Sequence, residues 1–539
     1  MKSGNASFGM DKAVRALREM FGFDGFRPNQ EPIVRAVLDG RDVIAVMPTG
    51  GGKSLCYQLP AYLMPGTCIV ISPLISLMKD QVDAAKSKGV RAEYLNSSQS
   101  GTEQKEVRSK LESGQCDLLY VAPERFATVG FTGVLKRVPI CLFAIDEAHC
   151  ISDWGHDFRP DYLGLADVVK EFPGVPIAAF TATATPDVQK DIISKLGLRR
   201  PFVLRASFNR PNLVYHVVPK TELGCQLLSV LGNWKKHSGI IYRSTRKSVE
   251  ETAAFLSEHG IPALPYHAGL DAAVRKKNQD EFIGGRVKVV VATIAFGMGI
   301  DKPDIRFVIH GDLPKNMEGY YQETGRAGRD GKPARCILYF DFADVPKIRY
   351  FINKIDNPAQ HQIATKKLNQ MIAYGTRQGC RRRYLLAYFG ERYPARNCSA
   401  CDVCTGERPR GTAGSQSVSQ SRGRKGSRTL SGAGRTLEAT WELVKQGLSH
   451  GEIAQRRSLK PSTVFGHLAE LVSQGHPVNV DRYVSAPRRQ LLEKLFSRFG
   501  TDRLKPVVEA AEGKIAYADA RLVRAALLRR KGEAADGQR

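Results

Sequence analysis

The sequence predicts an α/β protein with two separate parallel β-sheets, each covered by helices, followed by purely helical regions. Short runs rich in Val and Ile alternate with helix-length stretches from about residue 42 to residue 345, which is typical of strands buried on both faces of a parallel sheet. These runs are too numerous for one such sheet. A break at 205–211 (RASFNRP) divides them into two groups. We therefore expect two α/β domains with a cleft between them.

The predicted elements follow in order along the chain. The strand-forming runs are RDVIAVMP, TCIVIS, CDLLYVA, CLFAID and PIAAFTAT before the break, and GIIYRS, VKVVVAT, RFVIHGD and ARCILYF after it. Beyond residue 341 the pattern is helical as far as residue 389. A stretch rich in Gly, Ser and Arg, 406–435, lacks periodic apolar residues, which indicates a tether. Apolar periodicity returns from residue 436 and predicts a compact helical domain.

The charge balance favours a polyanionic partner. The chain has 539 residues, enough for roughly three or four domains, and its 80 Lys and Arg against 54 Asp and Glu give a net charge of +26. This excess is typical of proteins that bind nucleic acid, although a solubilising surface produces the same balance. The segment MKSGNASFGMDK has no apolar core, and no apolar run is long enough to span a bilayer. We expect a cytoplasmic protein without membrane contact.

A phosphate-binding loop, MPTGGGKS, follows the first predicted strand. Its consecutive glycines let backbone N–H groups close around a phosphate; they are Gly50, Gly51 and Gly52. Lys53 is expected to reach the β and γ phosphates of ATP, and the Ser54 hydroxyl to ligand Mg²⁺. The general pattern begins with Gly where this chain has Met47, so a chance glycine-rich turn is the alternative.

Two more pairs of residues fit nucleotide hydrolysis. Asp146 and Glu147 end the predicted strand CLFAI, where one carboxylate is expected to hold Mg²⁺ (Asp146) and the other to act on the attacking water (Glu147). Arg326 and Arg329, in QETGRAGRDG, are spaced to stabilise transition-state charge on the γ-phosphoryl group from across the cleft. The alternatives are a surface acidic pair at a strand end for the carboxylates and an exposed basic helix for the arginines. Hydrolysis would then require both domains, as in a motor.

The cysteines predict a structural metal site. Seven of the eleven are scattered singly over the first 336 residues, and we expect these to lie in the core. The other four are Cys380, Cys398, Cys401 and Cys404. Four thiolates with C-x₂-C-x₂-C spacing fit a tetrahedral Zn²⁺ site. An iron–sulfur cluster is the alternative, but the Cys-Pro that usually completes that pattern is absent.

Taken in order, the motifs resemble those of RecQ-family DNA helicases of superfamily two over about residues 14–404. The matching segments are FGFDGFRPNQ, MPTGGGKS, ISPLISLMKDQV, DEAHCISDWGHDFRPDY, FTATAT, GIIYRSTRKSVE, YHAGL, ATIAFGMGIDKPDIRFVIH and QETGRAGRDG. The resemblance implies two RecA-like domains at 1–206 and 207–345, a zinc-binding subdomain at 346–405, a linker at 406–435, a helix-turn-helix domain at 436–528 and a charged tail at 529–539.

The resemblance also assigns roles to further residues. It implies adenine contacts for Arg27 and Gln30, coupling of hydrolysis to movement by Thr181 and Thr183, and sensing of nucleotide and strand by Gly299 and Asp301.

The segment after the DEAH box resembles the aromatic-rich loop that senses single-stranded DNA in this family. Trp154 and Phe158 offer faces on which bases stack, and His156 and Arg159 offer phosphate or base contacts. Packing of the two aromatic rings into the core is the alternative. DEAH boxes also occur in RNA helicases, so the box alone does not select DNA.

The C-terminal part departs from many RecQ proteins, because neither a winged helix nor an HRDC domain is recognisable. Ser449 is predicted to cap a helix that runs through Arg457, and Pro461 to open a second helix. This pattern resembles the helix-turn-helix domain of some bacterial RecQ-like helicases; a protein-interaction domain is the alternative. The second helix carries Ser462, Thr463, Phe465 and His467, and phosphate contacts are expected from Arg456, Arg457 and Lys460. The run 381–383 (RRR) either touches DNA or covers the metal site.

These features predict an ATP-dependent 3′-to-5′ DNA helicase that acts in recombination and repair, with ATP, Mg²⁺ and Zn²⁺ as cofactors. The expected partners are single-stranded DNA, tailed or forked duplexes, and repair or single-strand-binding proteins. Three alternatives stay open: a translocase or remodelling ATPase that does not unwind, an ATP-switched DNA-binding regulator, and a helicase that acts on RNA.

Overall fold

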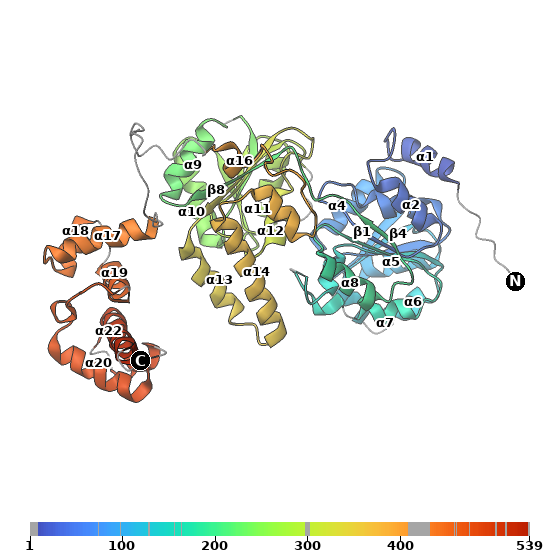
Figure 1. Cartoon of the computed structure of the whole chain (residues 1–539). Helices are drawn as coiled ribbons and strands as arrows, with labels where there is room; N and C mark the ends of the chain where they lie inside the picture. The colour runs from blue at the N-terminus through green and yellow to red at the C-terminus, as the bar shows by residue number, and fades with distance from the viewer. Residues whose placement is uncertain are drawn as a thin grey trace. The chain divides into compact units, whose positions relative to one another are not determined.

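The structure is a computed structural model that falls into two compact units, Met1–Ser415 and Gln416–Arg539, each described here by itself (Figure 1). It describes residues 9–73, 75–97, 99–127, 130–155, 157–162, 164–234, 236–296, 302–407, 432–457, 459, 461–473, 475–501, 504–511 and 515–536. No helix among these residues is long and apolar enough to cross a membrane.

The first lobe of the larger unit is a parallel sheet with its helices. The seven strands run in the order β3-β4-β2-β5-β6-β1-β7, with every neighbouring pair parallel. They are β1 Val43–Val46, β2 Thr67–Ile71, β3 Ala92–Leu95, β4 Leu118–Val121, β5 Ile140–Ile145, β6 Ile177–Thr181 and β7 Phe202–Arg205. The helices are α1 Met10–Glu19, α2 Gln30–Leu38, α3 Leu55–Leu63, α4 Ile75–Lys86, α5 Gly101–Glu112, α6 Phe131–Leu135, α7 Leu165–Lys170 and α8 Pro186–Leu196. Because β5, β6 and β1 are neighbours, the loops at their carboxyl ends meet at one edge of the sheet.

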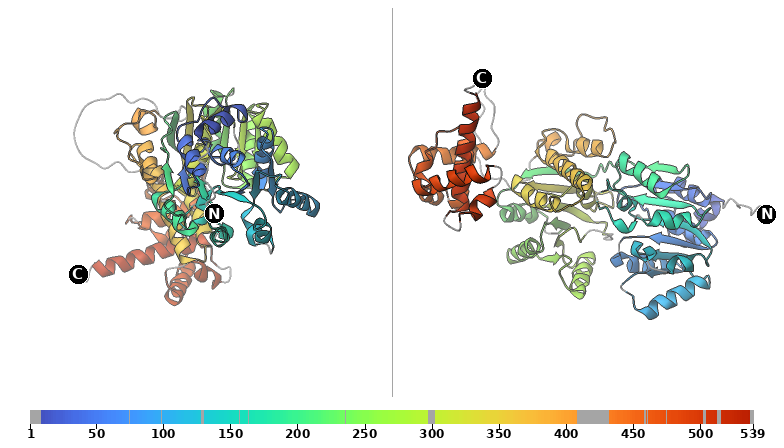
Figure 2. Two further views of the ribbon diagram at one scale, coloured as in Figure 1. Left: turned by 90° about the vertical axis from the view of Figure 1, so that its right-hand side faces the viewer. Right: turned by 90° about the horizontal axis from the view of Figure 1, so that it is seen from below.

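The second lobe has a parallel sheet of six strands in the order β10-β11-β9-β12-β13-β8. The strands are β8 Leu213–Pro219, β9 Ser238–Tyr242, β10 Ala263–Tyr266, β11 Val289–Ala292, β12 Ile305–His310 and β13 Ala334–Phe340. The helices are α9 Leu223–Gly232, α10 Arg246–Glu258, α11 Ala272–Ile283 and α12 Met317–Thr324. Figure 2 shows both sheets with their flanking helices. The predicted pair of helix-covered parallel sheets is confirmed.

All nine predicted strands are found, and the four strands that the sequence analysis missed are the edge strands β3, β7, β8 and β10. An edge strand is only partly covered, so it needs fewer apolar residues than a central one. All four show this in their mixed burial. The central strands β1, β2, β4, β9 and β11 are buried along their whole length.

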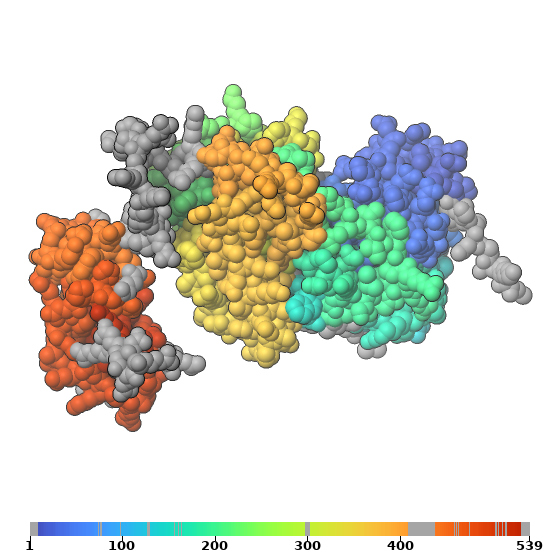
Figure 3. All heavy atoms as spheres, in the orientation of Figure 1, coloured from blue at the N-terminus to red at the C-terminus, as the bar shows by residue number. Residues whose placement is uncertain are grey.

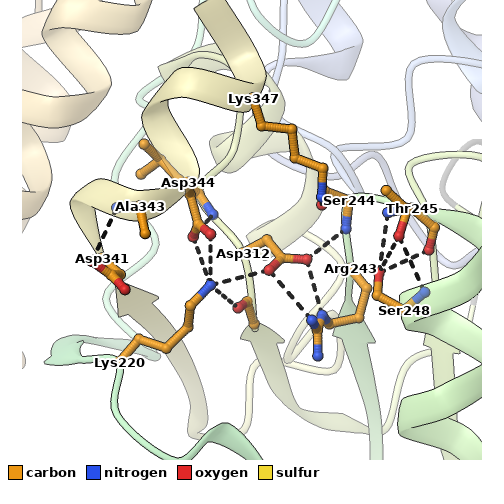
Figure 4. A network of polar contacts seen from close by, with 12 residues as sticks. Lys220, Arg243, Ser244, Thr245, Ser248, Asp312, Asp341, Ala343, Asp344 and Lys347 are labelled. Atoms are coloured by element: carbon orange, nitrogen blue, oxygen red, sulfur yellow. Dashed lines mark hydrogen bonds and ion pairs between the residues drawn. The ribbon is translucent and has the colours of Figure 1, made fainter. Parts of the chain in front are cut away.

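A helical region follows the second sheet and is anchored to it by buried ion pairs. Its helices are α13 Val345–Ile352, α14 Pro358–Thr376, α15 Arg381–Tyr388 and α16 Asp402–Thr405. Lys220, just after β8, contacts Asp312 at 3.1 Å and Asp344 at 2.7 Å (Figure 4). Arg243, just after β9, donates to Asp312 at 2.9 Å. Asp344 precedes α13, so this network fixes the start of α13 to the carboxyl edge of the second sheet.

The smaller unit contains helices around a separate apolar core. They are α17 Gly432–Lys445, α18 His450–Arg456, α19 Pro461–Ser473, α20 Ala486–Phe499, α21 Leu504–Glu509 and α22 Tyr517–Asp536. Ser449 caps α18 in a capping box with Glu452, and Pro461 opens α19, as the sequence predicts. The predicted helix-turn-helix arrangement is therefore present, with α18 and α19 as its two helices.

One prediction about the cysteines is wrong. Six of the seven scattered cysteines are buried, but Cys225 is exposed. It lies in the first turn of α9, whose buried residues are Gln226, Leu227, Val230 and Leu231. Cys225 is off that stripe and faces outward, although most residues of this helix are apolar.

Candidate active site

The phosphate loop joins β1 to α3. Gly50 and Gly52 adopt left-handed conformations, with φ of 84° and 77°, which residues with a side chain rarely adopt. The Lys53 ammonium lies 3.5 Å from the carbonyl of Met47. Met47, the departure from the general pattern, is 1% exposed and its N–H donates to Thr181. Its side chain belongs to the core, so the substitution leaves the phosphate-facing part of the loop unchanged.

Arg27 and Gln30 hold this loop from the side of α2. Arg27 Nη1 donates to the carbonyl of Gly50 at 2.9 Å, and Gln30 Nε2 donates to that of Gly52 at 3.0 Å. The Arg27 N–H donates to Gln30 Oε1 at 2.8 Å. A Cβ at residue 52 would lie 2.3 Å from Gln30 Nε2. The structure thus brings both predicted residues to the phosphate loop.

The acidic pair lies at the carboxyl end of β5, beside the phosphate loop. Asp146 is 8% exposed. Burial and the Glu147 carboxylate raise the pKa of Asp146 to about 6, against the lowering effect of Lys53. A divalent cation bound to this carboxylate would stabilise its ionised form. Glu147 is held in a left-handed conformation, with φ 46°, an uncommon geometry for a residue with a side chain that is often found at functional sites.

His149 connects the acidic pair to the end of β6. Its Nδ1 lies 2.9 Å from Thr181 Oγ1 and 3.3 Å from Glu147 Oε2. The Thr183 N–H donates to Thr181 Oγ1 at 3.3 Å. All four residues lie within one buried or nearly buried chain of contacts. A displacement of His149 would therefore move its contact with the Glu147 carboxylate.

Both predicted arginines lie just beyond α12 in the second lobe; Arg329 reaches the phosphate loop, whereas Arg326 interacts with Tyr242 of β9. Arg326 is 3% exposed. The Arg329 side chain passes over the phosphate loop, since its Cγ lies 3.4 Å from where a Cβ on Gly50 would be. The predicted meeting of the two lobes at one site is therefore seen in the structure. Gly299 and Asp301 lie outside the described residues.

The aromatic loop, residues 152–159, follows the DEAH segment. Trp154 is 49% exposed, so its ring is not part of the core, which was the alternative. Phe158 is partly buried, with the Lys195 ammonium 5.8 Å from its ring centre. Arg159 pairs with Asp157 and donates to the carbonyl of Pro73 at 3.1 Å. His156 lies outside the described residues.

The role of Gly155 in this loop was not predicted from the sequence. A Cβ at residue 155 would lie 2.2 Å from the carbonyl oxygen of His149 and 2.9 Å from that of Ser152. The loop therefore folds back directly onto the DEAH backbone. The glycine between Trp154 and Phe158 could have indicated this, because a close approach of two backbone segments requires a residue without a side chain.

The four clustered cysteines meet at one point. Their sulfur atoms all lie within 4.8 Å of one another. Backbone N–H groups of Arg383 and Cys398 donate to the sulfurs of Cys380 and Cys404, each at 3.4 Å. Donors of this kind stabilise thiolates, and four thiolates without a free position are the ligand set of a structural Zn²⁺ site. The residues fit the predicted metal.

Two members of the arginine run are internal. Arg381 is 6% exposed and binds Asp402 at 3.0 Å; Arg382 is 2% exposed and donates to Asn209 at 2.7 Å and to two backbone carbonyls. The interpretation that these two contact DNA is wrong, because their guanidinium groups are occupied inside the protein. Arg382 attaches the metal region to the second lobe, Arg381 joins α15 to Asp402 within the metal region, and Arg383 alone of the three is exposed.

The second helix of the helix-turn-helix pair, α19, is largely a core element. Phe465 is 7% exposed, and His467 Nδ1 lies 2.9 Å from Thr440 Oγ1. No Lys or Arg occurs in α19. Arg456 is exposed, Arg457 bonds to Thr440, and Lys460 lies outside the described residues. The side chains of α19 therefore do not support contacts with base edges. Phosphate contact by Arg456, Arg457 and Lys460 stays a prediction.

Four family models match the chain. They are DEAD/DEAH box helicase at 27–192, helicase conserved C-terminal domain at 220–331, RecQ zinc-binding at 342–405 and helix-turn-helix domain at 436–524.

Curated relatives match over about three quarters of the chain. The ATP-dependent DNA helicase RecQ of Haemophilus influenzae is 46% identical, with 73% of this chain and 63% of the relative covered. That of Pasteurella multocida is 47% identical, with 73% and 62% covered. That of Bacillus subtilis is 43% identical, with 74% and 68% covered. The chain thus spans less than two thirds of the length of the first two.

Solved structures show the same two-lobed fold. A DEAD-box helicase bound to single-stranded RNA matches with a TM-score of 0.54 at 15% identity, covering 72% of this chain and 92% of that one. The helicase MrfA bound to DNA matches with a TM-score of 0.52 at 19% identity, covering 68% and 54%. At these identities the match concerns the fold alone.

Proposed function

The chain belongs to the RecQ family of helicases, and from this premise we propose that it is an ATP-dependent DNA helicase that moves 3′-to-5′ on single-stranded DNA. Its proposed substrates are tailed and forked duplexes in recombination and repair, and its proposed location is the cytoplasm. Repair and single-strand-binding proteins are proposed as partners. Because the chain spans only part of the first curated relatives, their activity is carried over as a proposal.

The observation that carries this proposal is the meeting of both lobes at the phosphate loop. Lys53 and Asp146 come from the first lobe, and Arg329 passes over Gly50 from the second. In the proposed mechanism Lys53 binds the terminal phosphates, and Ser54 and Asp146 would hold Mg²⁺, which would supply positive charge to the phosphates. The arginines stabilise the transition state only when the lobes are closed. Each hydrolysis cycle would therefore open and close the cleft.

The remaining residues of the site have narrower roles in the proposal. Glu147 orients and deprotonates the attacking water. His149 contacts both Glu147 and Thr181 and holds the Glu147 carboxylate in place. Arg27 and Gln30 contact adenine in the nucleotide-bound protein. In the present structure they donate to backbone carbonyls of the phosphate loop. Gly299 and Asp301 are proposed to sense nucleotide and strand.

DNA reaches this chemistry through the aromatic loop. Trp154 and Phe158 are proposed to stack on bases, while His156 and Arg159 contact the strand. Since Gly155 packs on the His149 carbonyl, movement of the loop is transmitted to the segment that carries Glu147. Zn²⁺ held by the four cysteines would cross-link the helical region and keep it folded against the second lobe.

Strand separation tests the proposal. A duplex with a 3′ single-stranded tail is unwound by the protein in the presence of ATP and Mg²⁺, whereas a 5′-tailed duplex is not, and Lys53→Ala unwinds neither. ATP hydrolysis is stimulated more by single-stranded DNA than by RNA of the same sequence. Hydrolysis of ATP without unwinding would indicate a translocase and not a helicase. Stronger stimulation of hydrolysis by RNA than by DNA would indicate that RNA is the substrate.

A further inference from the structure

The side chain of Lys367 joins three parts of the larger unit. Lys367 lies on α14 in the helical region, its ammonium donates to the backbone carbonyl of Trp154 at 2.7 Å, and it forms an ion pair with Glu318 at 2.8 Å. Trp154 belongs to the aromatic loop of the first lobe, and Glu318 to α12 of the second. We call this set of contacts the Lys367 bridge.

The bridge is shielded from water. The side chain of Lys367 is 12% exposed and that of Glu318 is 2% exposed. Ionic contacts are stronger in such surroundings than at a solvated surface, and a buried charge is costly when its partner moves away. Tyr388 also interacts with Glu318, so the carboxylate is fixed from two directions. A shift of Lys367 is therefore resisted by, and transmitted to, α12.

The far end of α12 carries the two site arginines. Arg326 and Arg329 follow the helix, and the turn that carries them is stiffened by Arg210, which donates to the backbone carbonyls of Gly325, Ala327 and Gly328. Glu318 is the second residue of the same helix. Because α12 and this turn form one rigid piece, a tilt of its start at Glu318 changes how Arg329 lies over Gly50.

The near end of the bridge is at the surface where a base is proposed to stack. The ring of Trp154 is half exposed, and the bridge holds its backbone carbonyl. A groove of about 280 Å³ beside it is lined by Phe158, Phe351 and Lys367, among others. Figure 3 shows the yellow and orange surface of the helical region against the green surface of the first lobe. The groove gives the loop space to move when a base stacks.

We propose that Lys367 is a positioning residue that transmits DNA occupancy of the aromatic loop to Arg326 and Arg329. This inference rests on the proposed function. The contact of Gly155 with His149 acts within the first lobe, on the half of the site that carries Glu147. The Lys367 bridge acts on the other half, so that one bound strand aligns both sides of the cleft.

The test measures ATP hydrolysis with and without single-stranded DNA in Lys367→Met, which keeps the length of the side chain but removes its charge and donor. The expected result is a fall of at least tenfold in the DNA-saturated turnover. Turnover without DNA and the DNA concentration for half-maximal stimulation each stay within about threefold of wild type. The matched control is Lys366→Met, which removes the same charge from the exposed neighbouring position and is expected to behave as wild type.

A second variant separates transmission from simple charge compensation. In Lys367→Met/Glu318→Gln both buried charges are gone, so a lysine that only neutralises Glu318 would no longer be needed and stimulation would return. Transmission requires the donor on the Trp154 carbonyl, so the double variant is expected to remain unstimulated. Its thermal unfolding temperature shows that it is folded.

The outcomes are distinguishable. If single-stranded DNA does not stimulate ATP hydrolysis by the wild-type protein, the proposed function itself is overturned. Normal stimulation of wild type together with normal stimulation of folded Lys367→Met, or recovery in the double variant, would overturn the role of Lys367 alone.

Discussion

Replacing Gly155 by Ala tests how the aromatic loop is connected to the hydrolytic centre. The new Cβ would lie 2.2 Å from the His149 carbonyl oxygen, whereas ordinary contacts begin at 3.4 Å and real Cβ atoms essentially never approach closer than 3.0 Å. Backbone lies on both sides of this contact, so no flexible side chain can yield. The loop and the DEAH backbone must separate by about 1 Å, and a misplacement of about 1 Å costs about 100-fold in rate.

The expected result is a fall of about 30- to 100-fold in DNA-stimulated ATP turnover, equivalent to about 2–3 kcal/mol in the barrier. Affinity for ATP stays near wild type, because the phosphate loop is not touched. The assay is steady-state hydrolysis at saturating single-stranded DNA, with nucleotide binding measured separately. Gly164→Ala is the control, since a Cβ there meets nothing within 4 Å. Folded Gly155→Ala that keeps more than half of the stimulated rate would refute the reasoning.

The remaining predictions concern the second lobe and the metal. Arg329→Ala lowers ATP turnover by about 10³-fold with little change in ATP affinity; a loss below tenfold in rapid-quench assays argues against a transition-state role. Cys404→Ser lowers the zinc content measured by atomic absorption, whereas the exposed Cys225→Ser retains it; equal zinc in both contradicts the four-cysteine site. Burial alone would raise the pKa of Asp312, but Arg243 and a backbone N–H hold it well below its usual range. The ionised carboxylate therefore stabilises the fold above about pH 4, the unfolded value, and less as the pH falls below it. Asp312→Asn lowers the free energy of unfolding by about 3 kcal/mol at pH 7. The difference in this free energy between wild type and variant, measured by urea unfolding, becomes smaller below pH 4; a difference that does not change with pH contradicts this assignment.

The central strands and the individual motifs were predictable because each depends on residues that are adjacent in the chain. A strand buried on both faces must be apolar throughout, so β1, β2 and β9 are visible as runs. A phosphate loop needs its glycines and Lys53 within one turn, and the metal knuckle needs three of its cysteines within seven residues. The edge strands β3, β7, β8 and β10 lacked that pattern, because a strand with one neighbour is not required to be apolar on both faces.

The sequence by itself determined which chemical groups this protein has; tertiary structure decided which of them meet. Arg381 and Arg382 are a basic run in sequence, yet folding turns both inward onto Asp402 and Asn209. Lys367 is one lysine among many until α14 brings it to the carbonyl of Trp154, 213 residues away in the chain. Local patterns record the environment that a residue needs, whereas contacts between distant segments depend on how whole elements pack. The physical link between the aromatic loop and the arginines could therefore be found only in the folded chain.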